Sequence, residues 1–149
     1  MNFTMLHQRS ALGAVALAGV LGILAACASM SSSTPTQQIV LSGSNEVPAV
    51  TTSAAGTGTV TINPDQTVSA SITVSGMTAT ASHIHEGAAG ANGPVIVPFT
   101  KTGDNTFAAP AGAKLTDSQY ASYKAGNLYV NVHSAKNPGG EIRAQLKGN

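Results

Sequence analysis

Short stretches in which apolar and polar residues alternate, each ended by Gly, Pro or Asn, constrain the fold of this chain more than any other feature. In the segment 57–62, for example, Val60 and Ile62 fall on one side and three threonines on the other. Successive side chains of a β-strand point to opposite faces, so this period of two is typical of strands that bury one face. The sequence therefore predicts an all-β antiparallel sandwich or barrel.

Eight segments carry this signature, and we predict a strand in each of them: 39–44, 57–62, 67–74, 81–85, 95–99, 105–108, 127–133 and 141–146. The turn-forming residues 63–66 join the second and third strands into a hairpin. In the last segment, Ile142 and Ala144 point one way, whereas Glu141 and Arg143 point the other. We therefore expect Glu141 and Arg143 to face solvent.

A helical signature interrupts the strands at residues 115–126. Thr116 and Gln119 fit a capping box, in which each side chain bonds to the backbone of the other residue. Gly126 can adopt the left-handed conformation that commonly follows a helix. We expect one short helix in this part of the chain.

The beginning of the chain has the layout of an export signal. Arg9 is followed by an uncharged, apolar run over residues 11–26. The sequence Leu24-Ala25-Ala26-Cys27 resembles the lipobox of bacterial lipoproteins, which implies cleavage before Cys27 and lipid on its sulfur. A transmembrane anchor and an ordinary secretory signal are the alternatives.

This interpretation divides the chain into three parts. Residues 1–26 are expected to form the signal peptide, residues 27–37 a flexible tether that begins at lipidated Cys27, and residues 38–149 the folded domain. The protein would then be exported and held to a bacterial membrane by its lipid. Ala28 after the cysteine favours the outer membrane, facing the periplasm or the cell surface.

Charge and cysteine content exclude several classes of function. The chain has seven Lys and Arg residues against six Asp and Glu, and Arg9 leaves with the signal, so the mature protein is neutral. It has no basic patch for nucleic acid. Cys27 is its only cysteine, so no disulfide can form within the chain. Stability must come from packing.

Three histidines are the candidate ligands of the predicted domain. His83 and His85 are two residues apart, which places both rings on one face of a strand. His133 alternates with Leu128, Val130 and Val132, so it also points away from an aliphatic face. If the two strands are close, three neutral imidazoles can meet in a set suited to copper or zinc. Alternatively, the rings bond to local backbone groups and to Glu86 and Glu141.

These segments together closely resemble the CHRD domain, a module first recognised in the secreted regulator chordin and widespread in exported bacterial proteins. The resemblance covers about residues 38–147. Its motifs are Leu41-Ser42-Gly43-Ser44-Asn45-Glu46-Val47-Pro48, His83-Ile84-His85-Glu86-Gly87, and Leu128-Tyr129-Val130-Asn131-Val132-His133 with Asn137-Pro138-Gly139-Gly140.

The resemblance implies an immunoglobulin-like β-sandwich that is distantly similar to copper/zinc superoxide dismutase. In that comparison, His83 and His85 look like the dismutase pair of copper ligands, and His133 looks like the later one. The bridging ligand and the zinc site have no counterpart. Glu141 stands where the dismutase has an arginine that attracts its anionic substrate, so dismutase activity is not expected.

The sequence thus predicts a non-catalytic, lipid-anchored binding module whose metal ligands are His83, His85 and His133, with copper as the metal. Glu86, Glu141 and Asn131 are the side chains expected to support the ligands. A copper-dependent oxidoreductase related to dismutases is one alternative. A structural or adhesive envelope module without metal is the other.

Overall fold

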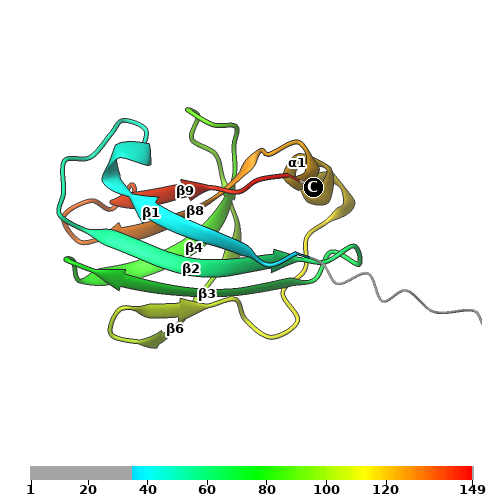
Figure 1. Cartoon of the computed structure of the whole chain (residues 1–149), viewed down its shortest axis with the longest axis horizontal. Helices are drawn as coiled ribbons and strands as arrows, with labels where there is room; N and C mark the ends of the chain where they lie inside the picture. Colours follow the sequence, from blue (N-terminus) through cyan, green and yellow to red (C-terminus); the bar gives the residue numbers. More distant parts are fainter. Residues whose placement is uncertain (1–34, 149) are drawn as a thin grey trace, which may run out of the picture. The chain divides into compact units, whose positions relative to one another are not determined.

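The computed structural model describes residues 35–148, so the predicted signal peptide and the lipidation site Cys27 lie outside the described residues. The described part contains nine strands, one α-helix and one 3-10 turn (Figure 1). Their bounds are β1 Gln37–Ser42, η1 Gly43–Asn45, β2 Ala55–Ile62, β3 Val68–Ser75, β4 Ala79–Glu86, β5 Val95–Pro98, β6 Thr100–Gly103, β7 Thr106–Ala108, α1 Asp117–Lys124, β8 Leu128–Ser134 and β9 Ile142–Gln145.

The nine strands form one sheet whose ends meet. The order across the sheet is β5-β4-β8-β9-β1-β2-β3-β7-β6, and the paired strands are antiparallel. Its two end strands, β5 and β6, are separated in the chain by Phe99 alone, whose N–H donates to the carbonyl of Ser82 on β4 at 3.0 Å. Lys101 of β6 also donates to a β4 carbonyl, that of Ala79, at 2.8 Å. The sheet is therefore nearly closed into a barrel, and the predicted all-β fold is confirmed.

The apolar faces of the strands turn inward and form one core. Its largest fully buried apolar side chains are Tyr123, Phe107, Leu41, Ile62, Ile72, Ile84, Leu128, Ile142, Leu146 and Val60. Their alternation along the strands is the pattern from which the sheet was predicted. Burial of these side chains supplies the main stabilising free energy of the domain.

The helix α1 lies within the predicted segment and has the predicted ends. The Thr116 side chain accepts a hydrogen bond from the Gln119 N–H at 3.2 Å, and the Gln119 side chain accepts one from the Thr116 N–H at 2.9 Å, which confirms the capping box. Gly126 has the expected positive φ of 75°. Tyr123 of α1 is fully buried in the core. Within residues 35–148, no helix combines the length and the apolarity needed to cross a membrane.

One strand was missed, and one expectation from the sequence is wrong. Strand β6 was not predicted, because all four of its residues are exposed and no apolar alternation marks it. The solvent-facing side of the last strand is not exposed: Glu141 is 5% exposed and Arg143 is 1% exposed. The connection 87–94 covers Arg143, which donates to the carbonyls of Ala88 and Ala91 at 3.3 and 2.9 Å.

Candidate metal centre

Strands β4 and β8 bring the three predicted ligands together. The two strands pair antiparallel, with His83 opposite Asn131 and His85 opposite Tyr129. One ring nitrogen from each of His83, His85 and His133 lies within 4.8 Å of the other two. His85 and His133 are buried and His83 is half-buried. The predicted convergence of the three rings is confirmed.

Backbone carbonyls fix which nitrogen of two rings faces the cluster. His85 Nδ1 lies 3.0 Å from the Gly93 carbonyl, and His133 Nδ1 lies 2.9 Å from the Pro138 carbonyl. A carbonyl oxygen only accepts hydrogen bonds, so both rings carry their proton on Nδ1 when neutral. The Nε2 lone pairs of both rings are therefore available, as is usual for metal-binding histidines held by a second partner.

Of the three ring nitrogens that face one another in the cluster, two share a hydrogen bond and the third has no partner among residues 35–148. His133 Nε2 lies 3.0 Å from His83 Nδ1. Because His133 carries its proton on Nδ1, its Nε2 accepts this hydrogen bond and His83 Nδ1 donates it. His85 Nε2 is buried and has no hydrogen-bond partner among residues 35–148. A buried polar atom without a partner is rare in proteins because its lost hydration is not compensated. A metal ion bound to His83 Nδ1, His85 Nε2 and His133 Nε2 would replace the hydrogen bond between His83 and His133, with the proton of His83 moved to its Nε2.

The carbonyls of Gly93 and Pro138, which hold the His85 and His133 rings, come from turns that require glycine. A Cβ atom at Gly93 would overlap the carbonyl of Glu86, and a Cβ atom at Gly140 would collide with the side-chain amide of Asn131. Gly140 also has a φ of 134°, a conformation that side chains disfavour. The turn 137–140 that carries the Pro138 carbonyl thus packs directly against β8.

Burial favours the neutral forms of His83 and His85. Desolvation, followed by the nearby His133 and His85 rings, lowers the pKa of His83 to about 4. Desolvation is also the main reason that the pKa of His85 is lowered. Protons and metal ions compete for the same imidazole nitrogens. His83 therefore stays neutral well below pH 6.5, where an exposed histidine becomes protonated, and the lowered pKa of His85 likewise favours its neutral form.

The three side chains expected to support the ligands bond elsewhere. Glu86 accepts a hydrogen bond from Ser122 Oγ at 2.5 Å, and Asn131 donates to Glu46 at 3.3 Å. Glu141 accepts hydrogen bonds from the hydroxyls of Thr52 and Ser134. Their supporting role at the metal centre stays a prediction.

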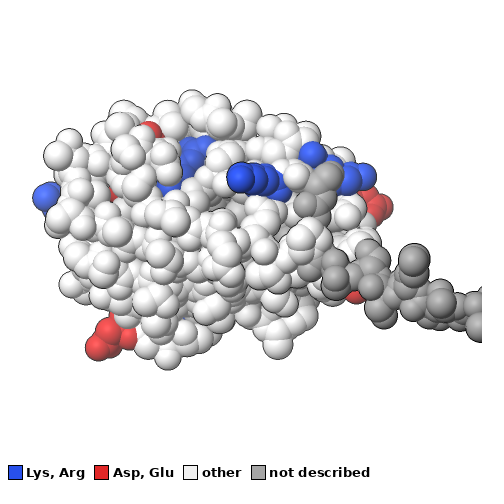
Figure 2. All heavy atoms as spheres, in the orientation of Figure 1, with Lys and Arg blue, Asp and Glu red and all other residues white. Residues whose placement is uncertain are grey.

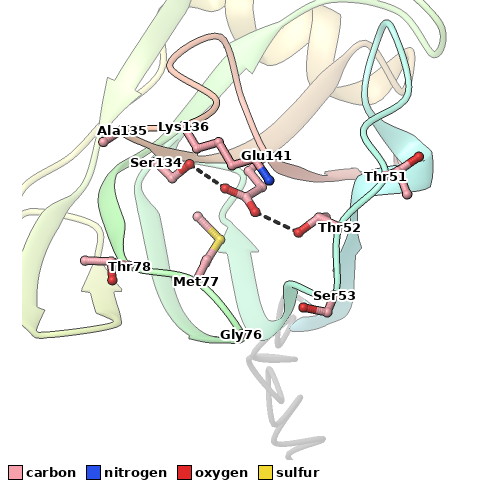
Figure 3. A pocket seen from close by; sticks show the side chains of 10 residues that line it. All are labelled: Thr51, Thr52, Ser53, Gly76, Met77, Thr78, Ser134, Ala135, Lys136 and Glu141. Atoms are coloured by element: carbon pink, nitrogen blue, oxygen red, sulfur yellow. Dashed lines mark hydrogen bonds between the residues drawn. The ribbon is translucent and has the colours of Figure 1, made fainter.

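Glu141 instead lies at a surface cavity of about 590 Å³ (Figure 3). Hydroxyl-bearing residues line much of this cavity, together with Met77 and Lys136. Hydrogen bonding to Ser134 lowers the pKa of Glu141, so its carboxylate stays charged. None of the three histidines lines this cavity, which separates it from the metal centre.

A stack of three side chains beside the centre was not predicted. The His85 and Tyr129 rings are stacked, with centroids 4.9 Å apart and planes at 13°. The Arg143 guanidinium carbon lies 3.4 Å from the centroid of the Tyr129 ring, a cation–π contact. Because β8 lies between β4 and β9, the Tyr129 ring lies between His85 and Arg143. Alternation places these residues on one face but gives no sign that this face is covered.

A buried carboxylate near Arg143 also escaped the sequence analysis. Glu46 is 7% exposed, and its Oε1 has no partner among residues 35–148. Desolvation raises its pKa to about 7, against the lowering effects of Arg143 and Asn131. Glu46 lines a cavity of about 390 Å³ together with Asn92 and Pro138.

Replacing Glu46 by Gln is expected to make stability less dependent on pH. A carboxyl whose folded pKa is raised stabilises the fold fully only below its unfolded pKa, and this contribution is lost as pH rises through the folded pKa. For Glu46 that window runs from 4.5 to about 7. We compare the free energy of unfolding of Glu46→Gln with that of the unsubstituted protein at each pH. We expect this difference to shift in favour of Glu46→Gln by roughly 2 kcal/mol from pH 5 to pH 8.

Urea denaturation of both proteins at the two pH values measures this gain. Glu86→Gln serves as the control, because Glu86 is a second acidic residue whose carboxylate has a hydroxyl partner. Equal pH profiles for the Glu46→Gln and unsubstituted proteins would show that Glu46 does not titrate in this range.

The fold and the site together define a nearly closed antiparallel β domain with a buried cluster of three histidines on two adjacent strands. The family model of the CHRD domain matches residues 37–146, and the chain belongs to this family. No curated protein and no solved structure matches the chain.

Proposed function

We propose that this protein is a non-catalytic copper-binding module of the bacterial cell envelope, tethered to the membrane by lipid on Cys27. The observation that carries the copper proposal is the convergence of three imidazole nitrogens, two of them held in the metal-binding tautomer by backbone carbonyls. Imidazole is a good ligand for copper, and copper binds such sites more tightly than the other divalent ions of its row.

Binding rather than turnover is supported by the ligand set. Within residues 35–148, His83, His85 and His133 are the one group of three or more His, Cys, Asp or Glu residues placed to hold a metal ion. A second metal ion, as in the dismutase comparison, has no comparable set in that part of the chain. Most of the face shown in Figure 2 is uncharged, and its Lys and Arg atoms lie mainly in the upper half of the view.

Copper titration of the full-length protein tests the proposal. All samples carry Cys27→Ser, because the single thiol of the chain would bind copper itself. We expect one copper ion per protein, and the triple variant His83→Ala, His85→Ala, His133→Ala should lose this site. The matched control is His7→Ala, which removes the fourth histidine of the chain and should bind copper normally. Copper affinity that survives the triple substitution would refute the ligand assignment.

A further inference from the structure

We infer that the histidine cluster binds the cuprous ion, Cu(I), in preference to the divalent ions Cu(II) and Zn(II). This inference rests on the proposed metal function and deepens it by naming the oxidation state. It is carried by the number and charge of the ligands, by the buried charge of Arg143, and by the stack that brings this charge close to His85.

The cluster offers three neutral nitrogen ligands. Three nitrogens from His83, His85 and His133 lie within 4.8 Å of one another, and no carboxylate or thiolate of the described residues joins them. Cu(I) is satisfied by two or three ligands, whereas Zn(II) bound by three histidines needs a water molecule as its fourth ligand and Cu(II) favours a tetragonal set. Neutral ligands also leave the full ionic charge in a mostly buried site, which disfavours the doubly charged ions more strongly.

Arg143 adds a positive charge whose hydrogen-bond acceptors among residues 35–148 are all neutral. Arg143 is 1% exposed, and its guanidinium donates to the carbonyls of Ala88 and Ala91 and to the side-chain oxygens of Asn92 and Gln145. The nearby Glu46 offsets this charge only in part, because burial raises its pKa to about 7.

The stack places this charge one aromatic ring away from a ligand. Arg143 contacts the Tyr129 ring at 3.4 Å, and the Tyr129 ring stacks on His85 at 4.9 Å. The positive charge of Arg143 repels a bound metal ion in proportion to the charge of that ion. At this separation we expect it to disfavour Cu(II) relative to Cu(I) by about tenfold.

Affinities measured for three ions test the inference directly. The full-length protein with Cys27→Ser is titrated with Cu(I) under anaerobic, reducing conditions in competition with a chromophoric Cu(I) chelator. Cu(II) and Zn(II) are measured aerobically against their own chelators. We expect Cu(I) to bind at least about 100-fold more tightly than either divalent ion. For copper, this ratio corresponds to a reduction potential of the bound Cu(II)/Cu(I) couple about 120 mV above that of the free couple, at 59 mV per tenfold change in the affinity ratio.

Two Arg143 variants test the role of the stack. Arg143→Gln removes the charge and is expected to reduce the preference for Cu(I) over Cu(II) by about tenfold. The matched variant Arg143→Lys keeps the charge and should retain most of the preference. An unchanged ratio in Arg143→Gln overturns the role of Arg143. If that variant does not fold, the affinities of the unsubstituted Arg143 protein decide the inference.

The outcomes separate this inference from the proposed function. Divalent ions that bind the three histidines as tightly as Cu(I) overturn the preference and leave the metal site intact. Failure of all three ions to bind overturns the proposed function and the preference together. Tight Cu(I) binding that the triple histidine substitution abolishes supports both.

Discussion

Copper(I) at about a thousand times its dissociation constant is expected to raise the free energy of unfolding of the Cys27→Ser protein by about 4 kcal/mol. His83 and His85 lie on β4 and His133 on β8, so folding brings the three ligands together from separate strands. A ligand that binds only the folded state stabilises it by mass action. Anaerobic guanidinium denaturation with and without copper measures the difference.

The triple histidine variant is the control for this stabilisation. Without its three ligands it should unfold at the same denaturant concentration with and without Cu(I). Cu(I) should, by contrast, raise the free energy of unfolding of the His7→Ala protein as much as it raises that of the Cys27→Ser protein. Equal stabilisation of the triple variant would place the bound copper elsewhere on the chain and contradict the assignment.

Replacing Arg143 by Met is expected to lower the free energy of unfolding by about 3 kcal/mol or more. The Arg143 side chain is almost fully buried, and its guanidinium donates to the carbonyls of Ala88 and Ala91 in the connection 87–94. Buried acceptors that lose their donors cost about 1–3 kcal/mol each. Methionine retains an apolar stem of similar length but none of these hydrogen bonds. Urea denaturation without metal measures the loss.

A surface substitution of the same type controls for the loss of a positive charge. Lys114 is exposed, and Lys114→Met should change the free energy of unfolding by no more than about 0.5 kcal/mol. A loss as small as this in Arg143→Met would show that the connection 87–94 does not depend on Arg143. If Arg143→Met loses an intermediate amount of unfolding free energy, that loss is compared with the loss in Arg143→Lys, which keeps a hydrogen-bond donor at the same position.

The elements with a local signature could be predicted from the sequence. Alternation marks β2 and β3, and the capping residues Thr116 and Gln119 mark the start of α1. Alternation also placed His83 and His85 on one strand face and turned His133 away from the core. These properties depend on residues close together in the chain, so a pattern within the chain is enough to reveal them.

Properties set by the closure of the sheet could not be predicted in this way. Strand β6 has four exposed residues and is defined by its pairing with β7 rather than by its own composition. The sequence places Arg143 at the surface and gives no sign that Glu46 is buried, whereas both residues are buried in the structure. The pairing of β4 with β8 joins residues about 50 positions apart, and only the family resemblance pointed to it.

Strand β8 is buried along all seven of its residues and lies between β4 and β9. Such a strand opens only when most of the domain unfolds, so local fluctuations do not separate His133 from the β4 histidines. If the proposed metal is bound, a competing acceptor would reach it in the intact domain, at the half-buried His83 ring. The residence time of the metal would then be governed by ligand exchange at His83 rather than by how often the chain unfolds.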